Sequence, residues 1–402
     1  MMLKHLINSL LIVSSSACLA GNLNWKMESG VELRGFEHAG LGTNSDATVS
    51  LYAEPEFTYE TSQGTDIFSG KAFMRADNED AQRSHADIRE LSWLHINEES
   101  DLRIGISRVF WGVTESQHLV DVINQTDLVE NPDGEAKLGQ PMIQWAWMQD
   151  WGTLDLYALV GFRERRFPGE DGRFRTLYPI DKQATTYEAR NNKDRIDLAV
   201  RYSRTIESWD FAVSHFSGTA RTPVLEERPD IDGIKYAPHY PLLEQTGFVS
   251  QYVQGDWLWK VELISAQQQN QRFTASTFGF EYTQVGVFAS QADLGWLVEY
   301  SFDDRGTNGP SSFEHDWFAG WRLSANDPQS SEALLGLLWD PASGEKSVSI
   351  EASTRLGNDI KIAFEMRSYS GSKPADDLFS DDDKLLFLST ESYAQLEVAY
   401  YF

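Results

Sequence analysis

Stretches in which every second residue is apolar recur along almost the whole chain, and they restrict its fold more than any other feature. Between residues 257 and 263, one face carries two tryptophans, a valine and a leucine, while Lys260 and Glu262 occupy the other. A period of two places successive side chains on opposite faces of a β-strand. The sequence therefore predicts an all-β protein, because the same pattern recurs at 196–203, 294–301, 348–355 and 360–367.

The alternation fits both a β-sandwich, which buries its apolar face, and a membrane barrel, which turns that face to lipid. The links between the predicted strands distinguish the two folds. Short links fall near residues 62–64, 97–100, 151–152, 207–208, 255–256, 291–293, 326–330 and 357–358. They alternate with links that are mostly longer, at 37–47, 77–85, 112–140, 165–193, 219–240, 303–312 and 371–384, whereas those at 268–271 and 341–345 are brief. This asymmetry predicts a transmembrane antiparallel β-barrel of roughly 16 to 18 strands, with about 18 as the best estimate.

Composition also favours an exported chain embedded in a membrane. The mean hydropathy is polar, at -0.41, yet aromatic residues make up 12% of the sequence. No stretch of the sequence approaches the roughly 20 apolar residues of a membrane helix, whereas a barrel shows only every second residue to lipid and gathers its aromatic residues in girdles. The net charge of -27 argues against a nucleic-acid partner, because binding phosphates needs a basic surface.

Residues 1–20 are typical of a secretory signal peptide. Lys4 and His5 precede a short apolar core, and small residues fit a cleavage site after Ala20. The apolar core is too short to span a bilayer. Residues 21–402 are predicted to form a single barrel domain, and disulfide bonds have no part in it because the one cysteine precedes the cleavage site.

The last residues alternate as well, with Leu396, Val398, Tyr400 and Phe402 on one face. A final strand that ends on a terminal phenylalanine resembles the C-terminal signal of Gram-negative outer-membrane barrels. The resemblance implies localisation in the cell outer membrane of a Gram-negative bacterium. It also implies insertion by the barrel-assembly machinery through Phe402, and contact with outer-membrane lipid and lipopolysaccharide.

The link over residues 112–140 is too long for a simple hairpin and is expected to have its own structure. Its middle is predicted to be helical, because a capping-box sequence at Thr114 is followed by Leu119, Val122 and Ile123 at i, i+3 and i+4. Six carboxylates lie in this link against a single lysine.

The link also carries a resemblance. It is the third long link, and in porins the third outer loop folds into the lumen and sets the constriction. The run Phe110-Trp111-Gly112, with the segment 118–127 after it, resembles a poorly characterised family of proteobacterial porin-like barrels. The resemblance implies the fold and the location, and it implies nothing about the transported substrate. Independently, a barrel of this size leaves an aqueous channel, so we interpret the chain as a channel for passive diffusion of small hydrophilic solutes, narrowed by this link inside the lumen.

The residues of the link and of the wall give candidates for the pore. The predicted constriction residues are Glu115, His118, Asp121, Asn124, Asp127 and Glu130. By strand parity, the arginines expected on the inner wall are Arg103, Arg163, Arg201, Arg322, Arg355 and Arg367. An acidic loop that faces a basic wall would focus the field on passing solutes and set selectivity, and it would equally well brace or plug the barrel. Arg108 and Phe110 fall on the outer face by parity and are expected at the lipid-headgroup rim.

Two other functions stay open at this point. An uptake or export component for a hydrophobic or polymeric substrate would need an apolar path through the lumen. A lipid hydrolase at the rim would use His215 and Ser217, which share an outward face in a way that resembles outer-membrane phospholipase. The sequence lacks zinc-binding, Walker and glycine-rich nucleotide motifs, and we predict no enzyme activity, no metal site and no cofactor. It leaves a monomer and a homotrimer open.

Overall fold

The computed structural model of the chain describes residues 21–41, 45–231, 233–309, 311–371, 385, 388 and 390–402. The predicted signal peptide, residues 1–20, lies outside the described residues and stays a prediction. The wall strands are β1 (Gly21–Phe36), β2 (Ala47–Thr61), β3 (Asp66–Asp77), β4 (His85–Ile96), β5 (Ser100–Ser107), β6 (Gln140–Gln149), β7 (Gly152–Val160), β9 (Ile196–Ile206), β10 (Trp209–Thr219), β13 (Leu242–Gln254), β14 (Trp257–Gln268), β15 (Gln271–Gln284), β16 (Asp293–Asp303), β17 (Trp317–Ser324), β18 (Glu332–Trp339), β19 (Lys346–Leu356), β20 (Ile360–Ser370) and β21 (Tyr393–Tyr401). Short 3-10 helices are η1 (Lys182–Ala184), η2 (Asn192–Asp194), η3 (Val287–Ala289) and η4 (Gly306–Asn308). Within the described part of the chain, no helix is long and apolar enough to cross a membrane.

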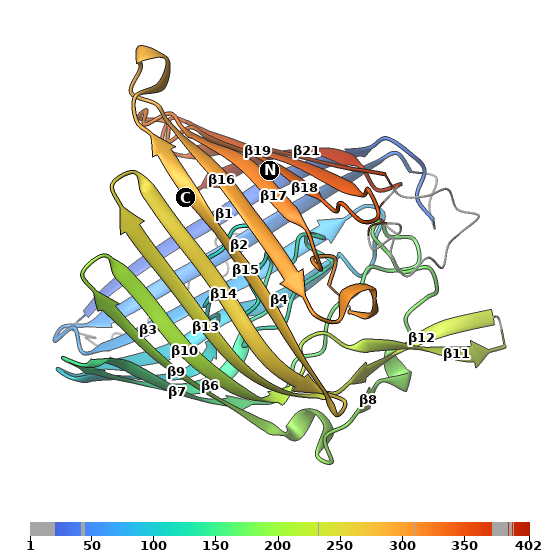
Figure 1. Cartoon of the computed structure of the whole chain (residues 1–402), viewed down its shortest axis with the longest axis horizontal. Helices are drawn as coiled ribbons and strands as arrows, with labels where there is room; N and C mark the ends of the chain where they lie inside the picture. Colours follow the sequence, from blue (N-terminus) through green and yellow to red (C-terminus); the bar gives the residue numbers. More distant parts are fainter. Residues whose placement is uncertain are drawn as a thin grey trace, which may run out of the picture.

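These wall strands form one 18-stranded sheet that closes on itself. Each strand pairs antiparallel with the next wall strand, and β1 pairs with β21 from Glu28↔Tyr401 to Phe36↔Tyr393. Figure 1 shows the strands inclined around the resulting ring. The predicted antiparallel barrel and its best estimate of strand number are confirmed.

The wall is apolar outside and polar inside, the reverse of a water-soluble protein. On β14, Trp257, Trp259 and Leu263 are 39%, 45% and 46% exposed, whereas the intervening Lys260 and Glu262 are 8% and 0% exposed. Exposed apolar side chains in this regular alternation fit a wall that spans a membrane, because lipid covers the outer face. The same parity holds to the end of the chain, where Phe402 is 69% exposed.

The connections lie on two rims, as predicted. At the short-turn rim, only residues 150–151 join β6 to β7, and residues 255–256 join β13 to β14. At the opposite, long-loop rim, residues 108–139 join β5 to β6. The two expected exceptions, between β14 and β15 and between β18 and β19, are indeed brief.

Aromatic side chains line up along the short-turn rim. Trp147 packs edge-on against Trp151, with ring centroids 5.4 Å apart, and Trp151 stacks on Tyr202 at 5.8 Å. Further along the rim, the rings of Trp209 and Tyr252 stack at 4.3 Å. Amphipathic rings in such a row are typical of the interface between membrane and water.

A second, three-stranded sheet lies at the long-loop rim, where the sequence predicted only links. It consists of β11 (Val224–Asp230), β12 (Gly233–Tyr240) and β8 (Thr186–Tyr187), and Figure 1 shows the β11–β12 hairpin beside the barrel. This hairpin has no apolar alternation, and prolines at 229 and 238 argue against a strand. β11 is almost wholly exposed and is defined by its backbone pairing with β12, which buries Ala237 and Tyr240 near its end.

Candidate functional site

The connection between β5 and β6, residues 108–139, is termed the lumen loop. Its backbone is bonded to Glu262 of β14, and its Glu130 is bonded to Arg75 of β3. These two strands lie on opposite sides of the ring, so the loop lies inside the barrel, where Figure 1 shows it in teal behind the front strands. The predicted position of this third long connection in the lumen agrees with these contacts.

The predicted helix in the middle of the lumen loop is wrong. The structure has turns there and no helix. The backbone N–H groups of Val113, Thr114 and Val120 donate to Glu262 of the wall, so they do not form the ladder of a helix. The apolar spacing that predicted a helix instead reflects packing against the inner wall.

Part of the lumen loop forms a hydrophobic core inside the barrel. Trp111, Val120 and Ile123 are 4%, 2% and 0% exposed. They pack with inward-facing residues of β6 to β15: Met142, Tyr157, Leu159, Ala199, Ala212, Phe216, Leu243, Val249, Ile264, Ala266, Phe273 and Ala275. Gly247 of β13 permits the approach, because a Cβ there would lie 2.9 Å from Val120 Cγ1. The loop is therefore packed against one side of the lumen.

This core gives a stability prediction. Replacing Ile123→Ala removes methyl groups from a fully buried site and is expected to weaken loop docking by about 2–5 kcal/mol. Limited proteolysis of the folded barrel should then cut the lumen loop faster than in the unmodified protein. Leu263→Ala, on the lipid face of β14, is the matched control and should leave cleavage unchanged. Equal cleavage rates in all three proteins would contradict the packing argument.

Two buried glutamates of the wall hold the backbone of the lumen loop. Glu262, which is 0% exposed, accepts three backbone bonds, from Val113 N (2.6 Å), Thr114 N (3.1 Å) and Val120 N (3.3 Å). Glu299 of β16 accepts three more, from Glu115 N (2.8 Å), Ser116 N (2.8 Å) and Ser116 Oγ (2.7 Å). Hydrogen bonds to a buried charge are strong, so these carboxylates fix this end of the loop.

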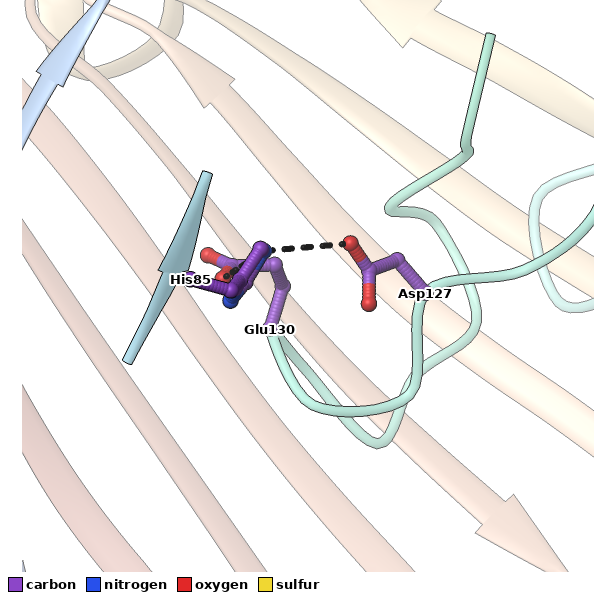
Figure 2. Close-up of side chains that lie close together, drawn as sticks. All are labelled: His85, Asp127 and Glu130. Atoms are coloured by element: carbon purple, nitrogen blue, oxygen red, sulfur yellow. Dashed lines mark ion pairs between the residues drawn. The ribbon is translucent and has the colours of Figure 1, made fainter. Parts of the chain in front are cut away.

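The other end of the lumen loop is held by an arginine cluster, defined as Arg34, Arg75, Arg83 and Arg89. Arg89 Nη2 lies 2.7 Å from Asp127 Oδ2, and Arg75 Nη2 lies 2.9 Å from Glu130 Oε2. Figure 2 shows His85 between these two carboxylates, with Nε2 3.7 Å from Asp127 and 3.6 Å from Glu130. Each of these charges is buried beside an opposite charge, and the pairs join the loop to the wall.

An opening lies beside the lumen loop, along β17 to β20. Two cavities of about 590 Å³ and 460 Å³ adjoin there. The larger cavity reaches Phe313 at the long-loop rim, and the smaller one reaches Glu332 near the short-turn rim. We name as the eyelet the four carboxylates that line both cavities: Glu115, Asp133, Glu135 and Glu351.

Basic side chains accompany the eyelet carboxylates. Arg322 Nη2 lies 2.5 Å from Glu115 Oε2, and Arg367 Nη2 lies 3.0 Å from Asp133 Oδ2. Burial raises the pKa of Asp133, an effect that the charge of Arg367 opposes. The eyelet is thus a band of paired and partly exposed charges.

Glu135 is the most exposed of the eyelet carboxylates, and its Oε1 lies 3.2 Å from Nε2 of the more buried His118. Burial lowers the pKa of His118, but the hydrogen bond and charge of Glu135 outweigh it, and the pKa ends above its ordinary value. The same hydrogen bond lowers the pKa of Glu135. Both shifts favour the charged forms of the two side chains and so favour the ion pair.

The six predicted constriction residues separate into two groups. Glu115 and His118 line the opening. The other four line neither cavity: Asp121 is paired with Lys137, Asn124 bonds backbone atoms of Ser107, Val109 and Leu138, and Asp127 and Glu130 are held by the arginine cluster. Burial raises the pKa of Asp121. These four side chains fix the loop in place.

The predicted wall arginines also lie in different surroundings. Arg322 and Arg367 line the opening, and Arg201 lines a separate cavity of about 460 Å³ at the short-turn rim. Arg163 lies beyond the end of β7 and is paired with Asp87 at 2.6 Å. Arg355 packs 4.8 Å over the ring of Tyr401, and Arg103 lies half-buried on the inner face of β5.

Sequence reasoning missed several residues of the site. Glu262, Glu299 and Glu351 sit on polar faces of alternating strands, so parity places them inside just as it does the arginines. Phe110 was expected on the outer face, at the lipid-headgroup rim, but its ring lies against His118, with ring centroids 4.7 Å apart, and lines the larger cavity. The chain leaves β5 at Ser107, and strand parity has no meaning beyond that residue.

The pair of His215 and Ser217 does not form a hydrolase site. Ser217 Oγ donates its one hydrogen to Glu244 Oε1 at 2.6 Å. His215 Nε2 lies 3.4 Å from the other oxygen of Glu244. The acid thus stands between serine and histidine, whereas activation of the serine needs the histidine next to the hydroxyl.

The comparisons with known proteins find similarity at the level of structure. No family model matches the sequence, and no curated protein matches it. OccK3 (OpdO) of Pseudomonas aeruginosa aligns over 95% of both chains, with a TM-score of 0.53 and 8% identity. A loop-deletion mutant of OmpT, an outer membrane protein of Vibrio cholerae, aligns over 95% of this chain and 100% of its own, with a TM-score of 0.47 and 11% identity. A mutant of Rh. blastica porin aligns over 95% of this chain and 100% of its own, with a TM-score of 0.43 and 11% identity. With its closed 18-stranded wall, the chain has the fold of a porin-like outer-membrane β-barrel.

Proposed function

We propose that the protein is an outer-membrane channel for passive diffusion of small hydrophilic solutes, with selectivity set at the eyelet. The observation that carries the proposal is the pair of adjoining cavities beside a loop held inside a membrane barrel. Lipid and lipopolysaccharide would cover the exposed apolar wall. Each barrel holds its own opening, so the proposal applies equally to a monomer and to a homotrimer.

The charges that line the opening favour cations. Among the described residues around the two cavities, the carboxylates are Glu115, Asp133, Glu135, Glu332, Glu351, Glu365 and Glu397. The lysine and arginines there are Arg322, Lys361 and Arg367. An excess of carboxylates raises the local concentration of cations and lowers that of anions.

The eyelet gives the test of this proposal. The triple variant Asp133→Asn, Glu135→Gln, Glu351→Gln is expected to lower the cation-to-anion permeability ratio several-fold, because it removes most of the excess negative charge. Reversal potentials of the purified protein in planar bilayers, under a potassium chloride gradient, measure this ratio.

The matched control for the eyelet variant is Glu56→Gln, which changes a glutamate of β2 that pairs with Lys26 at 3.9 Å and lines neither cavity. It should leave the reversal potential unchanged. An unchanged potential in the triple variant would remove the eyelet from the selectivity step. Absence of any conductance in the unmodified protein would refute the channel itself.

One side of the opening favours a second candidate, the passage of solutes that carry an apolar part. Phe318 of β17 and Leu334 and Leu338 of β18 line the larger cavity beside the eyelet, where Leu334 is the cross-strand neighbour of Glu351. An apolar strip beside charged groups suits solutes with both a charge and a hydrocarbon portion. Replacing Leu334→Ser and Leu338→Ser should slow entry of such solutes into proteoliposomes and leave potassium conductance unchanged. Equal uptake rates would exclude this candidate.

A further inference from the structure

A buried cluster behind the opening consists of His85, Asp127 and Glu130. The side chains of His85 and Asp127 are 8% and 0% exposed, and that of Glu130 is 10% exposed. One ligand atom from each of the three lies within 4.8 Å of the other two. Figure 2 shows the three side chains converging from β4 and from the lumen loop.

Three buried atoms in this cluster lack hydrogen-bond partners within the described part of the chain: His85 Nε2, Asp127 Oδ1 and Glu130 Oε1. The other carboxylate oxygens are satisfied, because Arg89 bonds Asp127 Oδ2 and Arg75 bonds Glu130 Oε2. A buried polar atom without a partner costs about 1–3 kcal/mol, and three such atoms in one cluster call for an explanation.

The hydrogen bond on the far side of the ring fixes the tautomer of His85. Nδ1 lies 2.8 Å from the carbonyl oxygen of Arg83, which can only accept, so Nδ1 carries a hydrogen. In the neutral ring, Nε2 therefore presents a lone pair to the two carboxylates. Histidines that bind metals are held in this way, with the other ring nitrogen donating to a carbonyl or carboxylate.

We propose that His85, Asp127 and Glu130 form a binding site for a divalent transition cation of the zinc class. Imidazole with carboxylates suits such ions, and bonds of about 2.0–2.1 Å place neighbouring ligands roughly 3.3 Å apart. The separation of 3.6 Å between His85 Nε2 and Glu130 Oε1 needs only a small contraction. Asp127, whose Oδ2 lies 3.7 Å from His85 Nε2 and is bonded to Arg89, would turn its unpartnered Oδ1 toward the cation. Water from the lumen completes a four-coordinate site.

The surroundings of the site supply its supporting shell. Arg75 and Arg89 orient the carboxylates through the oxygens that the cation does not use. The ring of Phe73 packs 5.5 Å from His85 and closes the site from the side of the wall. A bound cation joins β4 to the lumen loop, and this cross-link does not depend on what the channel transports.

The test is calorimetric titration of zinc chloride into the detergent-solubilised full barrel. We expect about one zinc ion bound per barrel, with affinity lowered more than about tenfold by His85→Gln and also by Glu130→Gln. Heat-modified migration on gels confirms that each variant is folded. Calcium and magnesium should not compete, because neither favours an imidazole ligand.

His95→Gln is the matched control, since His95 is on the same strand and pairs with the exposed Asp66. It should bind zinc as the unmodified protein does. Anomalous scattering from zinc-soaked crystals should place the ion between β4 and the lumen loop. The proposal is overturned if the unmodified barrel binds no zinc, if His85→Gln binds zinc equally well, or if the ion lies elsewhere in the crystals. Absence of zinc binding would mean that His85 is instead a charged imidazole that bridges the two carboxylates.

Discussion

Single-channel conductance is expected to rise several-fold when residues 114–135 are replaced by a short Gly-Ser linker. This segment contains Val120 and Ile123, which fill one side of the lumen, and three of the four eyelet carboxylates. An 18-stranded barrel without an inserted segment encloses a wide aqueous channel, so conductance should grow with the area released. Planar-bilayer recordings in concentrated potassium chloride would measure the change.

A second shortened variant controls for the loss of loop residues in general. The described residues between Glu226 and Ala237, in the β11–β12 hairpin, line neither of the two cavities of the opening. Trimming that hairpin should leave the conductance as it is in the unmodified protein. Should the lumen-loop variant also conduct as before, the loop does not obstruct the path.

The double variant Glu262→Gln, Glu299→Gln is expected to release the lumen loop without removing it. Together these carboxylates accept six hydrogen bonds from the loop, and an amide can accept fewer and presents a donor where donors already point. Each hydrogen bond to a charged group contributes roughly 1.5–3 kcal/mol. A net loss of about 3 kcal/mol in docking free energy would raise the undocked fraction more than about 100-fold.

Recordings of the double variant should show frequent steps to a higher conductance, where the unmodified channel is steady. Glu54→Gln is the matched control, because Glu54 is a partly buried wall glutamate paired with Lys71 and does not contact the loop. Steady traces from the double variant would mean that the apolar packing and the arginine cluster hold the loop without these glutamates.

The fold could be predicted almost entirely from local pattern. On β14 the alternation of Trp257, Trp259 and Leu263 with Lys260 and Glu262 identifies the strand and, once a membrane is assumed, its lipid face. The length of each connection then indicates on which rim of the barrel it lies. The β11–β12 hairpin escaped because β11 is almost wholly exposed and the buried residues of β12, Ala237, Pro238 and Tyr240, do not follow a period of two.

The site was predictable only where strand geometry extends to it. Arg322 and Arg367 were placed at the lumen by parity, and they lie on the opening. Within the lumen loop no period applies, so Glu115 on the opening and Asp127 behind it look alike in the sequence. What separates them is a partner distant in sequence, such as Arg89 for Asp127. Likewise, no spacing motif links His85 to Asp127 and Glu130.

The glutamates that fix the lumen loop impose an order on assembly. Glu262 and Glu299 lie 149 and 184 residues beyond the backbone groups that they bind. Contacts separated so widely along a chain form late, because the closure of a long intervening segment comes first. A chain exported only as far as β10 therefore lacks both glutamates and offers Val120 and Ile123 only the part of their packing surface that β6 to β10 supply. This apolar segment stays partly uncovered until β13 to β16 follow.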